Sequence, residues 1–265
     1  MMKTALAVNN LTHFYQRQSP VLEGISFSVG EAEFFIIIGP NGSGKTTILK
    51  AACGLIRPRE GDIEAFGSPV SSCSKKSLAR YIALVPQAPP ADIPFTVAEV
   101  VLMGRSPHLG LLSVENETDK DIALRTMSFT KVEHLASRRM DQLSAGEAQR
   151  VMIARAVCQQ SRIIVLDEPT AALDPAHQVE VMNLLQRLRR EEGTTVIMVS
   201  HDLNLAALYA DRLLLLKDGK MVSAGPPGEV LTGEILGLTY GCDFLVDRHP
   251  AGDFPRISLV PRALD

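Results

Sequence analysis

Short apolar runs alternate with segments of helical periodicity along this chain. Phe34–Ile38 and Ile163–Leu166 are apolar at every position, and Thr195–Val199 is a third such run after its first residue. A strand that is apolar at consecutive positions is typically buried on both faces, as in a parallel sheet covered by helices. The first 38 residues also have the pattern of strands separated by turns. The alternation predicts an α/β fold with a mostly parallel core sheet.

Three segments have the spacing of amphipathic helices. The first covers Thr46 to about Leu55, and the second lies near residues 116–130. The third follows Asp174 at a predicted N-cap, with Pro175 at the first helical position and Gly193 as the stop signal. The apolar positions that we expect on the buried faces of the first and third helices are Ile48, Leu49, Ala52, Leu55, Val181, Leu184, Leu185 and Leu188.

Proline and glycine residues mark the boundaries between segments of the chain. Residues 86–95 contain four prolines and are typical of a linker. We therefore expect one domain over 1–265, with a main lobe at about 1–86 and 161–225 and an inserted helical subdomain at about 87–160. An appendage of helix and strands would follow at about 226–265. Asp218-Gly219, between two short apolar segments, predicts a hairpin.

A glycine-rich loop follows the first buried strand. Residues 39–46 read GPNGSGKT, which fits the phosphate-binding pattern G-x-x-x-x-G-K-[ST], and they lie between a strand and a helix, as that motif requires. Glycines let backbone N–H groups curve around an anion, and a helix N-terminus adds partial positive charge. A glycine-rich turn with a surface lysine is the alternative, but the strand–loop–helix context favours phosphate binding. The nucleotide-binding residues predicted here are Gly39, Pro40, Asn41, Gly42, Ser43, Gly44, Lys45, Thr46 and Thr47.

Two adjacent carboxylates end the second buried strand. Asp167 and Glu168 precede Pro169, and successive side chains of a strand point to opposite faces, so the pair can divide two tasks. Asp167 would hold Mg²⁺ together with Thr46, and Glu168 would act on the attacking water as a general base. The alternative is that both cap the strand or the next turn. With a phosphate-binding loop upstream, the pair indicates a nucleotide-hydrolysing enzyme.

Composition and charge narrow the class of protein. The 265 residues are 46% hydrophobic and 22% charged, with a net charge of −3 and a pI of about 6.1. This balance argues against a nucleic-acid binder, which needs a basic footprint. The apolar runs fall far short of the roughly 20 residues that span a bilayer, and no N-terminal segment resembles a signal peptide. The four cysteines are scattered, as expected of free thiols in a reducing compartment.

A third motif precedes the acidic pair by about twenty residues. Residues 143–150 read LSAGEAQR, which resembles the L-S-G-G-Q signature of ABC ATPases. Ser144 and Glu147 also have the spacing of a capping box, and the two interpretations are compatible. The chain departs from the signature at Ala145 and Glu147. A Cβ at residue 145 would be costly if the backbone there has a positive φ, and Glu147 adds negative charge near phosphates.

The resemblance covers essentially the whole chain and implies further site residues. Gln87 matches the glutamine that contacts Mg²⁺ and water, and Asp174 matches the D-loop aspartate. His201 matches the switch histidine, and Tyr15 matches the aromatic residue that stacks on adenine. Each residue also has a simpler interpretation. Gln87 could be a polar linker residue and Asp174 a helix N-cap, while His201 could be a structural histidine and Tyr15 an exposed tyrosine. The resemblance implies Glu168, His201, Gln87 and Lys45 as the catalytic set, with Thr46, Gln87 and Asp167 at the metal.

The family also implies partners. ATP with Mg²⁺ would lie at the seam of a head-to-tail homodimer, between Lys45 and Thr46 of one copy and Ser144, Gly146 and Glu147 of the other. Two transmembrane permease subunits would dock on the region from Gln87 to about Leu112. An extracytoplasmic substrate-binding protein would act indirectly, and no nucleic acid would take part. The chain would be peripheral on the cytoplasmic face of a bacterial or archaeal membrane.

Within the family, residues 95–108 (FTVAEVVLMGRSPH) look like importers of iron-siderophores, haem and cobalamin, as do residues 229–232 and Tyr240-Gly241. An importer of molybdate, zinc or manganese is the alternative within transport, and export is a less favoured one. A non-transport ABC ATPase of translation or DNA repair would be expected to have tandem domains, coiled-coil insertions or a basic patch, and none is evident in the sequence. A P-loop kinase or nucleotide switch would leave residues 143–150 unexplained.

Overall fold

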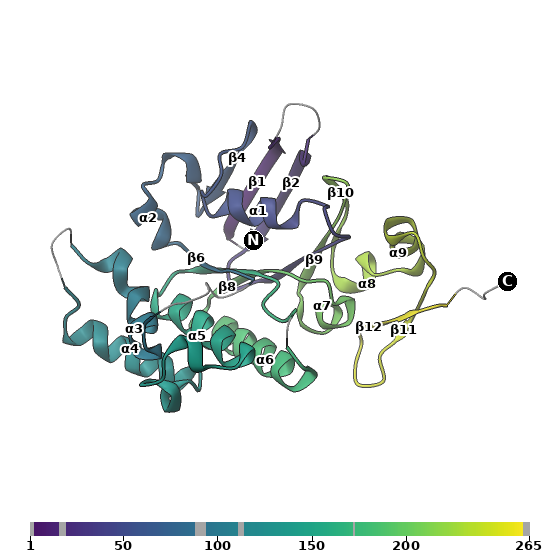
Figure 1. Cartoon of the computed structure of the whole chain (residues 1–265). Helices are drawn as coiled ribbons and strands as arrows, with labels where there is room; N and C mark the ends of the chain where they lie inside the picture. Colours follow the sequence, from purple (N-terminus) through teal and green to yellow (C-terminus); the bar gives the residue numbers. More distant parts are fainter. Residues whose placement is uncertain (1–2, 16–19, 88–93, 111–113, 172, 262–265) are drawn as a thin grey trace. The chain divides into compact units, whose positions relative to one another are not determined.

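The computed structural model describes residues 3–15, 20–87, 94–110, 114–171 and 173–261 (Figure 1). The chain divides into two compact units. The first combines residues 1–72 with 195–265, and the second contains residues 73–194. The described residues of the predicted linker are Pro86, Gln87, Pro94 and Phe95, because residues 88–93 lie outside the described ranges.

The first unit begins with an antiparallel sheet. Its strands are β1 (Thr4–His13), β2 (Leu22–Gly30), β4 (Glu60–Ala65) and β5 (Ser68–Pro69), in the order β2-β1-β4-β5. The 3₁₀ turn η1 (Val70–Ser72) follows β5. Figure 1 shows β1, β2 and β4 side by side in the purple and blue part of the ribbon. The strands predicted for the first 38 residues are therefore confirmed.

The same unit contains a parallel core. Strand β3 (Phe34–Ile38) pairs in parallel with both β8 (Thr195–Val199) and β9 (Arg212–Lys217), and every residue of β3 and β8 is buried. Strand β10 (Lys220–Gly225) pairs antiparallel with β9. The connecting residues Asp218 and Gly219 have φ of 48° and 75°, as the predicted Asp-Gly hairpin turn requires.

Helix α1 (Lys45–Ala52) is shorter than predicted. Ile48, Leu49 and Ala52 are buried as expected, but Leu55 is 60% exposed and lies beyond the helix. Cys53 ends α1, and Gly54 has a φ of 65°, which reverses the chain before Leu55 can continue the helical face. The apolar spacing alone therefore overextended this helix.

Beyond β8, the first unit continues into α7 (Leu203–Tyr209) and the C-terminal appendage. The appendage consists of α8 (Pro227–Val230), α9 (Gly233–Tyr240), β11 (Phe244–Arg248) and β12 (Pro255–Leu259). Helix and strands are confirmed there. The Asn204 side chain donates to the Ile257 carbonyl at 3.0 Å and accepts from the Ile257 N–H at 2.9 Å. This amide therefore pairs with β12 as a neighbouring strand would, and it fixes the β11–β12 hairpin to α7.

The second unit combines a parallel strand pair with a group of helices. Strands β6 (Ile82–Val85) and β7 (Ile163–Asp167) run parallel, with Val85 opposite Leu166. The helices are α2 (Lys75–Ala79), α3 (Val97–Leu102), α4 (Glu117–Phe129), α5 (Ala145–Cys158) and α6 (Pro175–Glu192), with 3₁₀ turns η2 (Met103–His108), η3 (Glu133–Leu135) and η4 (Met140–Gln142). Within the described ranges, no helix combines the length and apolar character needed to cross a membrane.

The helix starts of this unit follow the sequence signals. Ser144 and Glu147 form the predicted capping box at the start of α5, and Thr96 and Glu99 form a second one at the start of α3. Asp174 caps α6, and the predicted stop at Gly193 has a φ of 65°. Each cap satisfies backbone N–H groups that would otherwise lack a partner in the first helical turn.

A buried ion pair holds the helices of this unit together. Arg105 in η2 is 6% exposed, and its Nε donates to Asp119 on α4 at 3.0 Å. The same guanidinium donates to the Cys158 carbonyl at 3.0 Å and to Gln160 Oε1 at 2.8 Å, at the end of α5. Arg105 therefore joins η2, α4 and α5 through charge-assisted hydrogen bonds.

We expect Arg105→Ala to lower the free energy of unfolding by about 3 kcal/mol, because the substitution leaves Asp119 buried without its partner. Urea denaturation at pH 7 measures this change. The hydrogen bond from Arg105 holds the pKa of Asp119 below its usual range. The stabilisation is therefore present above the unfolded pKa and is lost as the pH falls through the folded one.

Lys120→Ala is the matched control, since Lys120 pairs with Glu117 on the same helix while both side chains are exposed. It should leave the free energy of unfolding nearly unchanged, because an exposed ion pair contributes little to stability. Equal losses in the two variants would contradict the structural role given to Arg105.

Candidate nucleotide-binding site

The glycine-rich loop needs glycine for two separate reasons. Gly39 and Gly44 have φ of 148° and 97°, which side chains with a Cβ rarely adopt. A Cβ at Gly39 would lie 2.2 Å from the Leu216 carbonyl oxygen, and one at Gly44 would lie 2.5 Å from Leu22 Cδ2. The loop thus passes so close to β9 and β2 that the two ends of its turn have no room for side chains.

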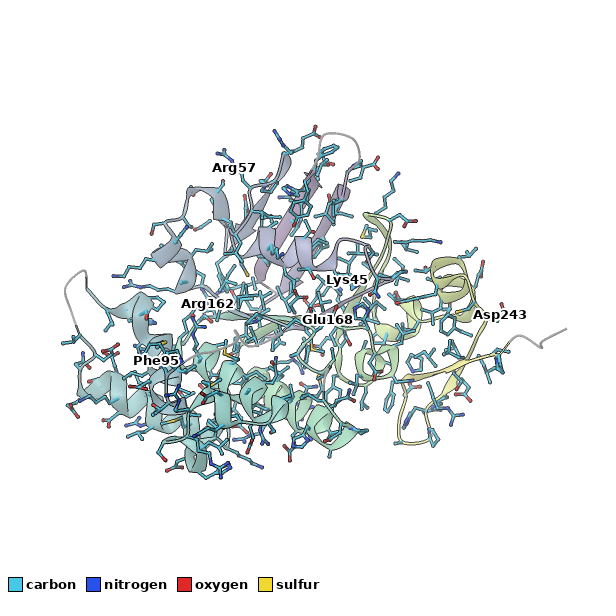
Figure 2. All side chains as sticks on the ribbon, in the orientation of Figure 1. Lys45, Arg57, Phe95, Arg162, Glu168 and Asp243 are labelled. Carbon is cyan, nitrogen blue, oxygen red and sulfur yellow. The ribbon has the colours of Figure 1, made fainter. Side chains whose placement is uncertain are left out.

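The lysine of the loop is buried at the start of α1. Lys45 is 5% exposed, and its Nζ donates to the Gly39 and Pro40 carbonyls at 2.9 and 2.8 Å (Figure 2 labels Lys45). Ser43 Oγ is also buried and has no hydrogen-bond partner within the described part of the chain. A desolvated cation and an unsatisfied hydroxyl in one tight loop suit a phosphate group, which accepts hydrogen bonds from both.

Tyr15 and Tyr240 flank this loop in the first unit. Tyr15 is 56% exposed, packs edge-on against the buried His13 ring at 4.9 Å, and places its hydroxyl 3.4 Å from Thr47 Oγ1 on α1. An exposed ring fixed next to the phosphate loop can stack on a base. Burial raises the pKa of Tyr240 to about 12, and a hydrogen bond with the Gly39 backbone opposes that shift. The appendage therefore reaches the first residue of the loop.

His201 follows the neighbouring parallel strand. Ile37 of β3 lies opposite Val199 of β8, and the Ser200 N–H donates to the Ile37 carbonyl at 3.1 Å. The carboxyl ends of these two strands therefore meet at one edge, where ligands of parallel sheets bind. Asp202 caps α7 by accepting from Asn204 and Leu205 N–H groups at 2.9 Å. The structure thus brings His201, the predicted switch histidine, and the glycine-rich loop to the same sheet edge.

In the second unit, the strand register brings two predicted site residues into contact. Gln87 lies two residues after Val85, and Glu168 lies two residues after Leu166, its partner on β7. Gln87 Nε2 donates to Glu168 Oε2 at 2.8 Å. Glu168, labelled in Figure 2, has a φ of 48°, which is uncommon for a residue with a side chain. Asp167 is the last residue of β7, and Glu168 follows it outside the strand.

The signature segment forms the start of α5. Ala145 is the first residue of α5 and is not among the described residues with positive φ. The backbone strain that a Cβ would cause at a positive φ therefore does not arise at this position. Ser144 Oγ and N–H both donate to Glu147 Oε2 at 2.8 Å, and the Glu147 N–H donates to Ser144 Oγ at 3.3 Å. Two hydrogen bonds from Ser144 hold the pKa of Glu147 below its usual range. The bond from the backbone N–H has the larger effect, and the bond from the hydroxyl comes second. Glu147 therefore completes the cap of this helix.

The D-loop segment is held by a histidine that the sequence motifs did not single out. Asp174 accepts from the His177 N–H at 3.0 Å and lies 2.7 Å from His177 Nδ1. Two hydrogen bonds from His177 hold the pKa of Asp174 below its usual range. The bond from the backbone N–H has the larger effect, and the bond from the side chain comes second. The i, i+3 spacing of an acidic N-cap and a histidine was the available signal. Ala172 lies outside the described residues, and Leu173 is half-buried.

The predicted site residues fall into two groups. Tyr15, residues 39–47 and His201 belong to the first unit. Gln87, Ser144, Gly146, Glu147, Asp167, Glu168 and Asp174 belong to the second. The first group can hold a phosphate chain and a base, and the second can orient a water molecule and offer a carboxylate to a divalent cation. Hydroxyl and carboxylate oxygens such as those of Thr46 and Asp167 are ligands that Mg²⁺ accepts. An α/β protein with this loop and this acidic pair is a P-loop nucleoside triphosphatase.

Comparison with known proteins gives the family. The ABC transporter family model matches residues 22–171, and the chain belongs to the ABC transporter ATPase family, with the α/β fold of its cassettes. The hemin import ATP-binding protein HmuV of Vibrio parahaemolyticus is 39% identical over 89% of this chain and 91% of its own length. The ferric enterobactin transport ATP-binding protein FepC of Escherichia coli is 37% identical over 89% of this chain and 88% of its own.

Solved structures give the same result for the fold. One is described as an inward-facing metal-chelate type ABC transporter, with a TM-score of 0.86 and 29% identity over 98% of this chain and 99% of the other. A second is a dimeric ATP-binding cassette, MJ0796, in a post-hydrolysis state with ADP and Pi. Its TM-score is 0.73 and its identity 31%, over 83% of this chain and 98% of the other.

We expect Gly39→Ala to destabilise the protein by several kcal/mol, since the new Cβ combines an unfavourable φ with a backbone oxygen at 2.2 Å. Gly42→Ala is the matched control, because Gly42 has a φ of 80° but open space at the Cβ position. It should cost only about 1–2 kcal/mol of backbone strain. Urea denaturation without nucleotide separates the two, and a larger loss at Gly42 would show that the contact with β9 is unimportant.

Proposed function

We propose that this chain is the ATP-binding and ATP-hydrolysing subunit of an importer of metal chelates, of the iron-siderophore, haem or cobalamin class. The observation that carries the enzymatic part is the buried Lys45 with the unsatisfied Ser43 hydroxyl in a loop that only glycine can form. The cargo class is supported by relatives that import hemin and ferric enterobactin, and by the metal-chelate type transporter with the same fold.

ATP binding would use the first unit. Backbone N–H groups of residues 41–46 would surround the phosphates, and Lys45 would exchange its two carbonyl partners for phosphate oxygens. That exchange is favourable because a charged acceptor replaces neutral ones. Tyr15 would stack on the adenine ring, which its exposure and its rigid support by His13 favour.

Hydrolysis would use residues of both units. The Glu168 carboxylate would accept a proton from the attacking water, and the hydrogen bond from Gln87 at 2.8 Å orients that carboxylate. His201 would contact the γ-phosphate. Thr46, Asp167 and Gln87 would hold Mg²⁺, which supplies positive charge to the β- and γ-phosphate oxygens.

The complete site would form between two copies of the chain. The signature residues Ser144 and Gly146 and the D-loop Asp174 would act on the nucleotide held by Lys45 and Thr46 of the other copy. The fold shared with a dimeric cassette bound to ADP and Pi supports this arrangement. Two identical chains in a closed dimer give two identical sites.

Coupling to a membrane would use separate subunits. We place two permeases against the surface formed by residues from Gln87 to about Leu112, within a helical subdomain at about 87–160. Residues 88–93 and 111–112 of this surface lie outside the described ranges. A substrate-binding protein would act from the other side. The main lobe would comprise about 1–86 and 161–225, and the chain would lie on the cytoplasmic face of a bacterial or archaeal membrane.

We expect Glu168→Gln to retain ATP binding while the rate of hydrolysis falls by about 10²–10⁴-fold, the usual contribution of a general base. Lys45→Ala should instead lose nucleotide binding. Titration with a fluorescent ATP analogue and a phosphate-release assay measure the two steps separately. Normal turnover by Glu168→Gln would show that another group activates the water.

Transport tests the cargo. The complex with its native permease would be reconstituted in liposomes, and the substrate-binding protein added empty or loaded with ferric siderophore, haem, cobalamin or molybdate in turn. We expect one loaded metal chelate to stimulate ATP hydrolysis and to accumulate inside. Stimulation by molybdate alone would move the chain to another importer class, and hydrolysis without inward movement would contradict import.

A further inference from the structure

His177 contacts two segments that are distant in sequence and belong to different motifs. It lies in the first turn of α6, where its backbone N–H donates to Asp174 Oδ1 at 3.0 Å. Its ring nitrogen Nδ1 lies 2.7 Å from the other carboxylate oxygen of Asp174. Both oxygens of the D-loop aspartate are therefore held by one residue, and the carboxylate has little freedom to rotate.

The same imidazole ring packs on the signature segment. A Cβ at Gly146 would lie 3.2 Å from His177 Cδ2 and 3.4 Å from His177 Cγ. Gly146 has helical backbone within α5, so a positive φ does not explain the glycine. The missing side chain instead gives the His177 ring room to lie against the backbone of the signature turn.

A second contact continues this one along both helices. Arg150 lies one turn beyond Gly146 on α5, and Glu180 lies one turn beyond His177 on α6. Arg150 Nη1 donates to the Glu180 carboxylate. The starts of α5 and α6 are thus joined at two successive levels, by close packing at the first turn and by an ion pair at the second.

From these contacts we infer that His177 is a positioning residue that holds the signature turn and the D-loop of one subunit in a fixed relative arrangement. The inference rests on the composite site proposed above, in which Gly146 and Asp174 both act on the nucleotide of the other copy. Two segments that must reach one partner together bind better when their relative position is set before contact, because less freedom is lost on closing. His177 itself touches no nucleotide in this scheme.

The test measures dimer closure separately from nucleotide binding. In a Glu168→Gln background, ATP should drive dimerisation of the isolated subunit, which analytical ultracentrifugation measures. We expect His177→Ala to raise the dimer Kd by about tenfold or more, since a small misplacement of a positioned group is costly. Affinity for a fluorescent ATP analogue below the dimerisation range, and the melting temperature without nucleotide, should stay unchanged. A purely structural role would alter those two readouts as well.

Two further variants make the result specific. His134→Ala is the matched control, because His134 is exposed in the same unit outside the D-loop and the signature. It should leave the dimer Kd unchanged. Gly146→Ala should weaken dimerisation by crowding the His177 ring, and His177→Ala in the same chain should recover part of that loss. Additive losses in this double-mutant cycle would overturn the packing argument.

The outcomes separate this inference from the proposed function. If Glu168→Gln fails to dimerise with ATP, the composite site itself is wrong. If Glu168→Gln dimerises with ATP and the added Ser144→Arg abolishes that dimer, the composite site stands. If His177→Ala in the same background then leaves the dimer Kd unchanged, the role of His177 is refuted.

Discussion

The approach of the glycine-rich loop to β9 is the constraint on which the first unit depends. Strand β3 lies buried between β8 and β9, so the chain that leaves it must turn sharply against a neighbouring backbone. At Gly39 that neighbour is the Leu216 carbonyl, too close to admit any side chain. Helix α1 begins directly after this turn, and Lys45 is buried against the Gly39 and Pro40 carbonyl oxygens. The way in which a fully apolar strand is packed therefore gives the chain a loop that suits an anion.

The second unit uses a parallel strand pair for a different purpose. The register of β6 against β7 puts Gln87 and Glu168 at equal distances beyond paired residues, and a hydrogen bond of 2.8 Å follows from that register. Glu168 also has a φ of 48°, a conformation that costs of the order of 1 kcal/mol or more. The buried β7 strand before it can sustain such strain.

Features set by local sequence could be predicted, whereas those set by packing between distant segments could not. The buried runs, the Asp218-Gly219 turn and the caps at Ser144 and Asp174 depend on a few adjacent residues. The end of α1 was misjudged because Leu55 kept the helical spacing after Gly54 had reversed the chain. The cost considered for Ala145 did not arise, because it required a backbone angle that sequence does not reveal. The contact between His177 and Gly146 joins residues on two helices, and no spacing rule indicates it.

Glu147 shows how one residue can serve both the fold and the proposed chemistry. A serine hydroxyl has one hydrogen to donate and two lone pairs to accept. In Ser144 the hydrogen goes to the Glu147 carboxylate, and one lone pair accepts the Glu147 N–H. Turning the hydroxyl toward a phosphate would give up the first bond and keep the second, so α5 would remain capped. The remaining cost is the repulsion between the Glu147 carboxylate and the phosphate. The positive charges of Arg138 and Arg150 stabilise the Glu147 carboxylate and reduce this cost. The departure from glutamine at this position is thus compatible with both the helix cap and a phosphate contact.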